Sequence, residues 1–206
     1  MKDEITVSIK KIKKRKKIIK IAKLTILILL LVLVLLYVIM GIIYNNGNFS
    51  ITLDKNLYFE RGIIIYDDPT YKVYREELYA KAVDYFDNIS YKWLPDNLDD
   101  EEGSHNGDNY IAYTFYIENT GTDTSDYWTE IIIDDVVKNV DSAVRIRVYK
   151  NGVPTTYAKI GANGNPEKET TPFVSDTLVA VDHVENFKPQ DIDKYTIVMW
   201  VEGTDP

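Results

Sequence analysis

An unbroken apolar run from Leu24 to Tyr44 dominates the hydropathy pattern of this chain, with 21 consecutive uncharged residues. An α-helix rises about 1.5 Å per residue, so the run spans roughly 30 Å, the thickness of a bilayer hydrocarbon core. Thr25 is its one hydrophilic side chain, and its hydroxyl can bond back to the helix backbone. Because no polar face interrupts it, the run predicts a transmembrane helix over residues 24–44 rather than the buried helix of a soluble domain.

After residue 48 the sequence predicts about eight β-strands, over residues 49–54, 56–68, 109–121, 126–134, 143–160, 177–184 and 187–203. In 49–54, 109–121 and 143–160 the apolar positions recur at every second residue, which is the period of half-buried strands. We expect a bulge or turn at Gly62 within the 56–68 segment. Residues 126–134 should return as a strand after the turn at 119–121. Residues 143–160 should form a hairpin, because Asn151-Gly152 favours a type I′ turn.

Two of these segments also show which side chains face the core. The segment at 109–121 places one apolar row on a single face, formed by Ile111, Tyr113, Phe115 and Ile117. The hairpin has an inward row of β-branched side chains, Val144, Ile146 and Val148. Arg145 and Arg147 alternate with that row, so this sheet should keep one face in water.

Residues 71–88 depart from the alternation and predict one short helix. Apolar side chains lie there near helical spacing with charges between them, at Val73, Leu78, Ala82 and Phe86. The predicted fold class is therefore mainly β. It consists of an N-terminal single transmembrane helix followed by an antiparallel β-sandwich, immunoglobulin-like or jelly-roll-like, with seven to nine strands and one short helix.

Charge divides the chain into the same parts. Residues 1–23 carry ten basic and two acidic groups, whereas residues 45–206 carry 14 basic and 30 acidic ones. A basic flank beside a membrane span stays in the cytoplasm, according to the positive-inside rule. We therefore expect a basic cytoplasmic tail (1–23), a transmembrane signal anchor (24–44), a spacer (45–48) and an extracellular β-sandwich domain (49–206).

The basic tail bears on the expected partners. Its centre, IKKIKKRKKIIK, could bind nucleic-acid phosphates. Because the tail lies next to a membrane span, attraction to anionic inner-leaflet lipids is the simpler explanation. We therefore expect these lipids as partners and no nucleic acid. The bilayer is the partner of residues 24–44.

A cleaved signal peptide is the alternative to an anchor. The run exceeds an h-region of roughly 7 to 15 residues, and no small-x-small site follows it.

The chain offers little for catalysis or metal binding. It has no cysteine, and its two histidines, His105 and His183, lie 78 positions apart without HExxH spacing. Residues 96–109 form an acidic loop, but aligning Gly103 with the sixth position of an EF-hand makes Leu98 the first ligand, which fails. We therefore expect no catalytic, cofactor-binding or metal-binding residue, no cofactor and no enzymatic activity. Calcium binding by the loop in another geometry stays open.

Two clusters could be mistaken for binding sites. The first is a basic patch, which more simply pairs with carboxylates on neighbouring strands; it comprises Arg145, Arg147, Lys150 and Lys159. The second is an aromatic row that could stack carbohydrate, although alternation should bury half of it in the core; it comprises Tyr110, Tyr113, Phe115, Tyr116, Tyr127 and Trp128. Asn48 and Asn88 begin glycosylation acceptor triplets, which matter only in a host that uses them.

The last segment carries a resemblance. Phe187-x-Pro189, followed by Asp191-x-Asp193-x-Tyr195 and TIVMWVE, resembles the tyrosine corner of a late strand in immunoglobulin-like and fibronectin-type sandwiches. With the anchor, the YIAYTFYIENTG strand and the WVEGTDP ending, the chain also resembles exported, membrane-associated β-sandwich proteins of Gram-positive bacteria. It is more distantly similar to the TasA and camelysin group. Proteins of this look often continue into another strand, which would make the present C-terminus a truncation.

That group includes biofilm-matrix filament subunits and a reported metallopeptidase. The chain departs from the former in keeping its hydrophobic anchor, and from the latter in lacking HExxH. We expect a non-catalytic, membrane-anchored cell-surface module for protein interaction or for surface or matrix assembly, which binds a surface protein or a second copy of itself through a sheet edge. The alternative is an extracellular sensor or ligand-binding ectodomain that signals through a separate partner, since the short tail cannot form a signalling domain. A camelysin-like metallopeptidase is the remaining alternative.

Overall fold

The computed structural model describes residues 2–45, 49–81, 83, 87–134, 136 and 140–203. They belong to two compact units, Met1–Asn46 and Gly47–Pro206. The first unit contains one long helix, and the second is a mainly β domain. The predicted fold class is therefore confirmed.

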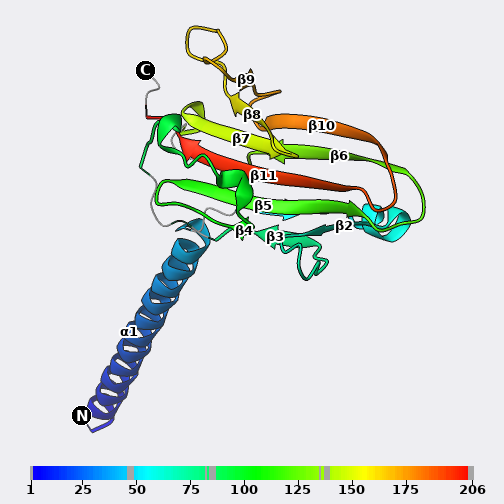
Figure 1. Ribbon diagram of the computed structural model, residues 1–206. Helices are drawn as coiled ribbons and strands as arrows, with labels where there is room; N and C mark the ends of the chain where they lie inside the picture. Colours follow the sequence, from blue (N-terminus) through cyan, green and yellow to red (C-terminus); the bar gives the residue numbers. More distant parts are fainter. Residues whose placement is uncertain are drawn as a thin grey trace. The chain divides into compact units, whose positions relative to one another are not determined.

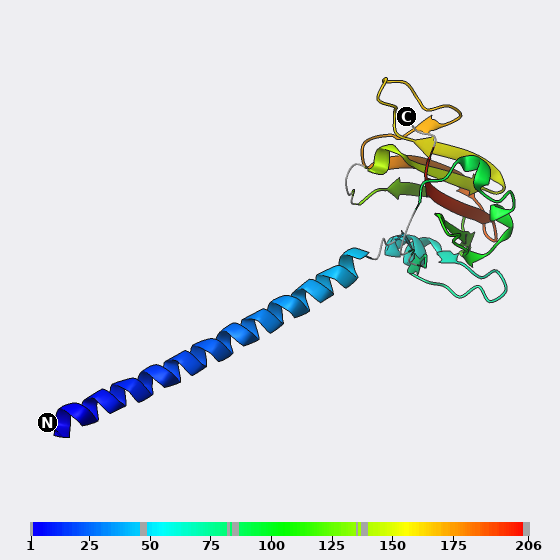
Figure 2. The same ribbon diagram turned by 90° about the vertical axis from the view of Figure 1, so that its left-hand side faces the viewer.

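The helix α1 (Lys2–Asn45) is unbroken, as Figure 2 shows. Within it, Lys14–Ile39 is the one segment of the described residues that is long and apolar enough to cross a membrane. Thr25 donates its hydroxyl hydrogen to the Ile21 carbonyl oxygen at 3.0 Å, so the polar atom in the run is satisfied inside the helix, as predicted. By length and composition, α1 is a candidate membrane span.

In the described part of the β domain, seven strands form the larger sheet, in the order β2-β5-β11-β7-β8-β9 with β4 beside β5 (Figure 1). They are β2 (Ile63–Tyr66), β4 (Gly103–Ser104), β5 (Tyr110–Asn119), β7 (Val144–Lys150), β8 (Val153–Ala158), β9 (Thr171–Pro172) and β11 (Ile192–Val201). All neighbours are antiparallel except β8 and β9. β11 lies between β5 and β7 and pairs with both.

Two smaller antiparallel sheets form a second layer. β6 (Ser125–Ile132) pairs with β10 (Leu178–Phe187), and β1 (Ser50–Thr52) pairs with β3 (Glu77–Tyr79). The two layers share one core, built from buried side chains such as Ile63, Leu78, Phe115, Tyr127, Ile146, Val179, Phe187 and Ile197. Of the eleven strands in the described residues, β4 and β9 have two residues each, which leaves nine longer strands, within the predicted range. The domain is a β-sandwich.

The outer face of the larger sheet is also covered at β5 and β11. A second cluster of buried side chains lies there, formed by Ile89, Leu94, Leu98, Ala112, Val198 and Trp200. The first three come from a segment that contains two short 3-10 helices, η2 (Tyr91–Trp93) and η3 (Leu98–Asp100). β5 and β11 are therefore buried on both faces.

The predicted hairpin is confirmed, with φ of 50° at Asn151 and 82° at Gly152, as a type I′ turn requires. Its inward row packs on the core, as predicted. The expected wet face is wrong at Arg145, which is 4% exposed. Glu167, from the loop between β8 and β9, lies 3.9 Å from the Arg145 guanidinium, so that loop keeps the side chain from solvent.

The helix predicted over residues 71–88 is wrong. Lys72 has a φ of 46°, which breaks a right-handed helix, and β3 lies where the helix should continue. Of the four apolar residues at helical spacing, Leu78 is buried in the core and Val73 is exposed. The other two positions, 82 and 86, lie outside the described residues. A short strand that buries a single side chain produced a spacing that imitates a helix face.

The segment 56–68 is a strand only in its second half. Leu57–Arg61 forms a π-helical turn, η1, in place of the predicted strand. Gly62 ends it with a φ of 71°, and its N–H donates to the Tyr58 carbonyl oxygen at 3.0 Å. The turn at Gly62 is therefore confirmed, and the strand before it is not.

A strand, β6 (Ser125–Ile132), forms over most of the predicted segment 126–134, but it does not return beside β5 as expected. Both edges of β5 are already occupied, by β11 on one side and by β2 and β4 on the other. Buried Asn119 at the end of β5 donates to the carbonyl oxygens of Asp123 and Phe187 at 3.0 and 2.8 Å, and accepts a bond from the Gly121 N–H at 2.9 Å. These bonds hold the loop that carries the chain to the second layer.

Candidate interaction site on strand β6

β6 lies at an open edge of the second layer. Trp128 of β6 faces His183 of β10, and Glu130 faces Val181. Within the part of the chain that the structure describes, β10 is the only strand paired with β6, whereas β5, β7 and β11 each have strands on both sides. In the described structure, the N–H and C=O groups on the far edge of β6 therefore have no strand partner.

The outward face of β6 alternates acidic and apolar side chains, in the order Asp126, Trp128, Glu130 and Ile132. Trp128 is 61% exposed and Ile132 is 56% exposed. Val181 of β10 is also exposed beside them. Large apolar side chains that gather in solvent on one pair of strands are typical of a contact surface.

β6 has few of the features that usually prevent edge strands from pairing. Its sequence, SDYWTEII, contains neither lysine nor proline. On its inner face Tyr127 is buried, but Thr129 and Ile131 are only half-buried, so the core is less well covered toward the end of the strand. Asp126 and Glu130 remain as the charges that select among partners.

Polar contacts attach this layer to the larger sheet. The Tyr127 hydroxyl donates to the Asp193 carboxylate on β11 and lies 3.1 Å from the hydroxyl of Tyr195, the residue of the predicted tyrosine corner. Burial, together with these hydrogen bonds, raises the pKa of Tyr127 well above its ordinary value of 10. Lys150 of β7 pairs with Asp182 of β10 at 2.5 Å. The position of β6 is therefore fixed even though its edge is open.

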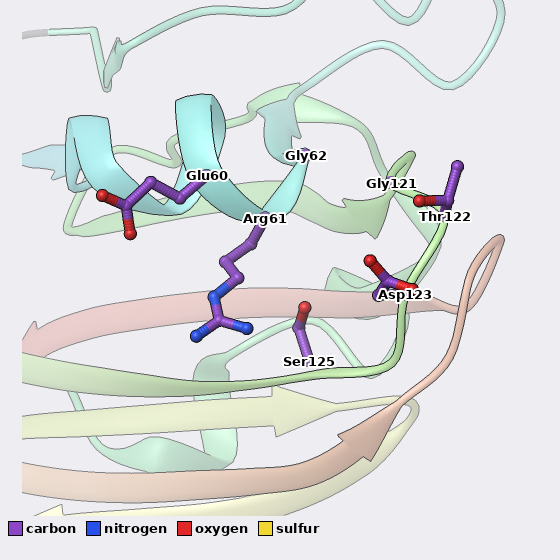
Figure 3. A pocket seen from close by; sticks show the side chains of 7 residues that line it. All are labelled: Glu60, Arg61, Gly62, Gly121, Thr122, Asp123 and Ser125. Atoms are coloured by element: carbon purple, nitrogen blue, oxygen red, sulfur yellow. The ribbon is translucent and has the colours of Figure 1, made fainter.

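A polar hollow of about 240 Å³ adjoins the start of β6 (Figure 3). Its lining consists of Glu60, Arg61, Gly62, Gly121, Thr122, Asp123 and Ser125. Figure 3 shows the Arg61 side chain extending from η1 toward β6, and the Ser125 side chain directed from β6 toward η1. Ser125 is buried, and its Oγ has no hydrogen-bond partner among the described residues. The hollow is therefore lined mainly by polar residues and lies against a buried hydroxyl without a partner among the described residues.

Close packing of two loops forms the floor of this hollow. A Cβ at position 121 would overlap the Arg61 carbonyl oxygen, so only glycine fits there. Thr120 donates to the Gly62 carbonyl oxygen from its N–H at 2.9 Å and from its hydroxyl at 2.6 Å. The hollow is thus a rigid extension of the β6 surface.

The basic residues of the hairpin do not gather into a patch. Lys150 and Arg145 have the carboxylate partners described above, and Lys159 lies 2.5 Å from Asp141. The Arg147 guanidinium instead lies over the indole ring of Trp200 on β11, 5.8 Å from the ring centroid. Three of the four residues therefore pair with carboxylates, but the predicted location on neighbouring strands is wrong, since the partners lie on a loop, a 3-10 helix and a strand of the second layer.

Half of the predicted aromatic row is buried in the core, as expected, namely Tyr113, Phe115 and Tyr127. Tyr116 stacks on Tyr66 with ring centroids 5.3 Å apart. Trp128 belongs to the β6 surface. The row is therefore divided between the two sides of the strands and does not form one stacking platform.

The two histidines lie on different elements. His183 stacks on Trp128 with ring centroids 3.9 Å apart, and its Nδ1 lies 3.5 Å from a Glu185 oxygen. His105 Nδ1 lies 2.9 Å from the Gly103 carbonyl oxygen. Among the described residues, which include the whole acidic loop 96–109, no group of three or more His, Asp or Glu side chains is placed to hold a metal ion.

A scan against protein-family models, a search of curated proteins and a search of solved structures each found no match to this chain. Its class therefore follows from its own residues: a β-sandwich with an open edge, preceded by a helix long and apolar enough to span a membrane. The absence of lysine and proline in SDYWTEII was the one local sign of this edge. The pairing that leaves it open depends on strands far away in sequence.

Proposed function

We propose that this chain is a non-catalytic, membrane-anchored module that binds an extended segment of another protein along β6. The observation that carries the proposal is a strand of eight residues with one neighbour and an exposed, partly apolar outward face. Strand addition to such an edge gives affinity through backbone hydrogen bonds and specificity through alternate side chains. The polar hollow beside Ser125 offers further contacts at one end of the bound segment.

The charge of the N-terminal tail supports the orientation of the module. Ten basic residues precede the apolar run, and such flanks are retained in the cytoplasm, where anionic lipids attract them. The β domain then lies outside the cell. In this orientation β6 is presented to proteins of the cell surface or its surroundings.

The charge of the domain favours a partner other than a second copy. Residues 45–206 have a net charge of −16, and Asp126 and Glu130 lie on the outward face of β6. Like charges directly opposite each other on antiparallel strands are destabilising. The partner segment should therefore place basic side chains opposite these two carboxylates and apolar side chains opposite Trp128 and Ile132.

Photocrosslinking in cells that express the full chain tests this proposal. A benzophenone amino acid replaces Ile132 on β6 in one variant and Val153 on β8, which is 67% exposed, in the matched control. We expect an adduct with another protein from the Ile132 variant only. The captured peptide should alternate basic and apolar residues, and the double substitution Asp126→Lys and Glu130→Lys should abolish the adduct.

Two results would contradict the proposal. Equal crosslinking from both positions, or none from position 132, would remove β6 as the site. An adduct that contains two copies of this chain and nothing else would show self-association and overturn the choice of partner.

A further inference from the structure

A cleft lies on the side of the larger sheet opposite to β6. It has a volume of about 210 Å³ and is lined by Ile89, Trp93, Asp108, Asn109 and Tyr110. Trp93 is 75% exposed, the most exposed of the three tryptophans. An indole ring that is three-quarters exposed removes little apolar surface from water, so core packing contributes little to holding it there.

One wall of the cleft is fixed to the larger sheet. The Glu202 carboxylate accepts hydrogen bonds from the N–H of Tyr91, which begins η2, and from the indole N–H of Trp200, both at 3.2 Å. Ile89 donates its N–H to the Val201 carbonyl oxygen at 2.9 Å and is buried in the cluster beneath η2. Trp93 is therefore exposed on a rigid support.

The opposite wall is a tight turn from residue 107 to 110. Gly107 and Tyr110 form an antiparallel bridge, and a Cβ on Gly107 would overlap the Tyr110 ring. This packing places Asp108 and Asn109 at the tip of the turn. Asn109 Oδ1 accepts the Asp87 N–H at 2.9 Å, which leaves its Nδ2 as the donor of that side chain, and the exposed Asp108 carboxylate is an acceptor.

We propose that this cleft binds a pyranose ring of a saccharide. The flat indole of Trp93 can cover the apolar C–H face of the sugar, while Asp108 accepts and Asn109 donates hydrogen bonds to its hydroxyl groups. Pockets for drug-sized ligands measure roughly 300–1,000 Å³, so a smaller cleft suits one ring of a longer chain that continues into solvent.

A bilayer surface is the other class of ligand that an exposed tryptophan could serve. The polar lining argues against it. Asp108 lies beside the ring in a domain of net charge −16, and anionic headgroups repel such a surface. The saccharide is therefore favoured, and the site is independent of the β6 edge.

Fluorine NMR of the full chain in lipid nanodiscs, labelled with 5-fluorotryptophan, gives one resonance for each tryptophan. Trp93→Phe and Trp128→Phe assign them. Cellohexaose and chitohexaose are the probes, each added up to about 10 mM, which reveals even millimolar affinity. Only the Trp93 resonance should move, and it should saturate, whereas Trp128 is a built-in control for non-specific effects on an exposed indole.

Substitutions then define the contacts. Trp93→Ala removes the fluorine reporter, so affinities of the variants are compared by isothermal titration calorimetry, in which Trp93→Ala should weaken binding by about tenfold or more, as the loss of a central aromatic anchor does. Asn109→Ala should weaken it less, and Trp128→Ala should leave it unchanged. A Trp93 resonance that neither saccharide moves, or one that moves no more than that of Trp128, overturns the proposal. Selective broadening of Trp93 by spin-labelled lipid would assign the ring to the bilayer and also overturn it.

Discussion

β11 and β6 each contain one tryptophan, yet the fold places the two strands in opposite surroundings. β11 has a strand on each edge and a buried cluster on each face, and its Trp200 is 1% exposed. β6 has one neighbour among the described strands, and its Trp128 extends into solvent. The place of a strand in the sandwich, rather than its composition, decides whether its aromatic side chain stabilises the fold or is available for contact.

Polar groups follow the same division. On the covered face of the larger sheet, the hydroxyl groups of Thr114 and Thr196 lie 2.7 Å apart, and Thr196 also donates to Asp99 at 2.7 Å. At the start of β6, the buried Ser125 Oγ has no partner in the described structure. The covered strands β5 and β11 thus satisfy these two hydroxyl groups internally, whereas the Ser125 hydroxyl at the start of β6 is left without a partner among the described residues.

Replacing each of these two tryptophans with alanine should give the largest difference in the free energy of unfolding between the two regions. Trp200→Ala leaves a cavity between β11 and the covering segment, and should lower the free energy of unfolding by about 3–5 kcal/mol. Trp128→Ala should change it by no more than about 0.5 kcal/mol, as expected for an exposed site. Urea denaturation of the full chain in detergent, followed by near-UV circular dichroism, measures both. Similar losses in the two variants would refute the division.

A smaller effect is expected at Asn119, where the chain passes from the larger sheet to the second layer. Asn119→Ala leaves two carbonyl oxygens and one N–H without their partner, and should cost about 1–3 kcal/mol. Asn163→Ala is the matched control, since this exposed side chain accepts one loop N–H at 2.8 Å. If the control lost as much stability as Asn119→Ala, burial of the amide would not be the cause.

The attachment of β6 to the larger sheet should show in the response to alkaline pH. Burial raises the pKa of Tyr127 above its ordinary value of 10, so the native state keeps this proton when the unfolded chain has lost it. The resulting stability is complete below pH 10 and decreases as the pH rises further. Tyr127→Phe should reduce the loss by up to about 1.4 kcal/mol per pH unit above pH 10. Parallel losses in both proteins would exclude Tyr127 as the cause.

The sequence predicted the parts of the fold that local patterns determine. The strand around residues 110–119 alternates, the one around residues 192–201 is rich in β-branched and aromatic residues, and Asn151-Gly152 defines its own turn, so these were confirmed. The helix predicted over residues 71–88 was wrong because apolar spacing in a segment with one buried side chain does not distinguish a helix from a short strand. The β6 edge was not predictable in detail, since it exists because β2, β4 and β11 occupy both edges of β5.

The cleft beside Trp93 was likewise not predictable from the sequence. The sequence drew attention to Tyr110 as a member of an aromatic row along β5 and β6, and did not single out Trp93. These two residues meet because the segment before the acidic loop folds across the outer face of the larger sheet. Tertiary contacts of that kind leave no periodic signal.

Amide hydrogen exchange of the full chain in nanodiscs tests the central claim, that β6 has a free edge, most directly. Along β11, which pairs on both sides, successive amides should all be protected. Along β6, protected amides that face β10 should alternate with rapidly exchanging amides that face the open edge. Uniform protection of β6 in the isolated chain would show that its edge is covered, and would contradict the account.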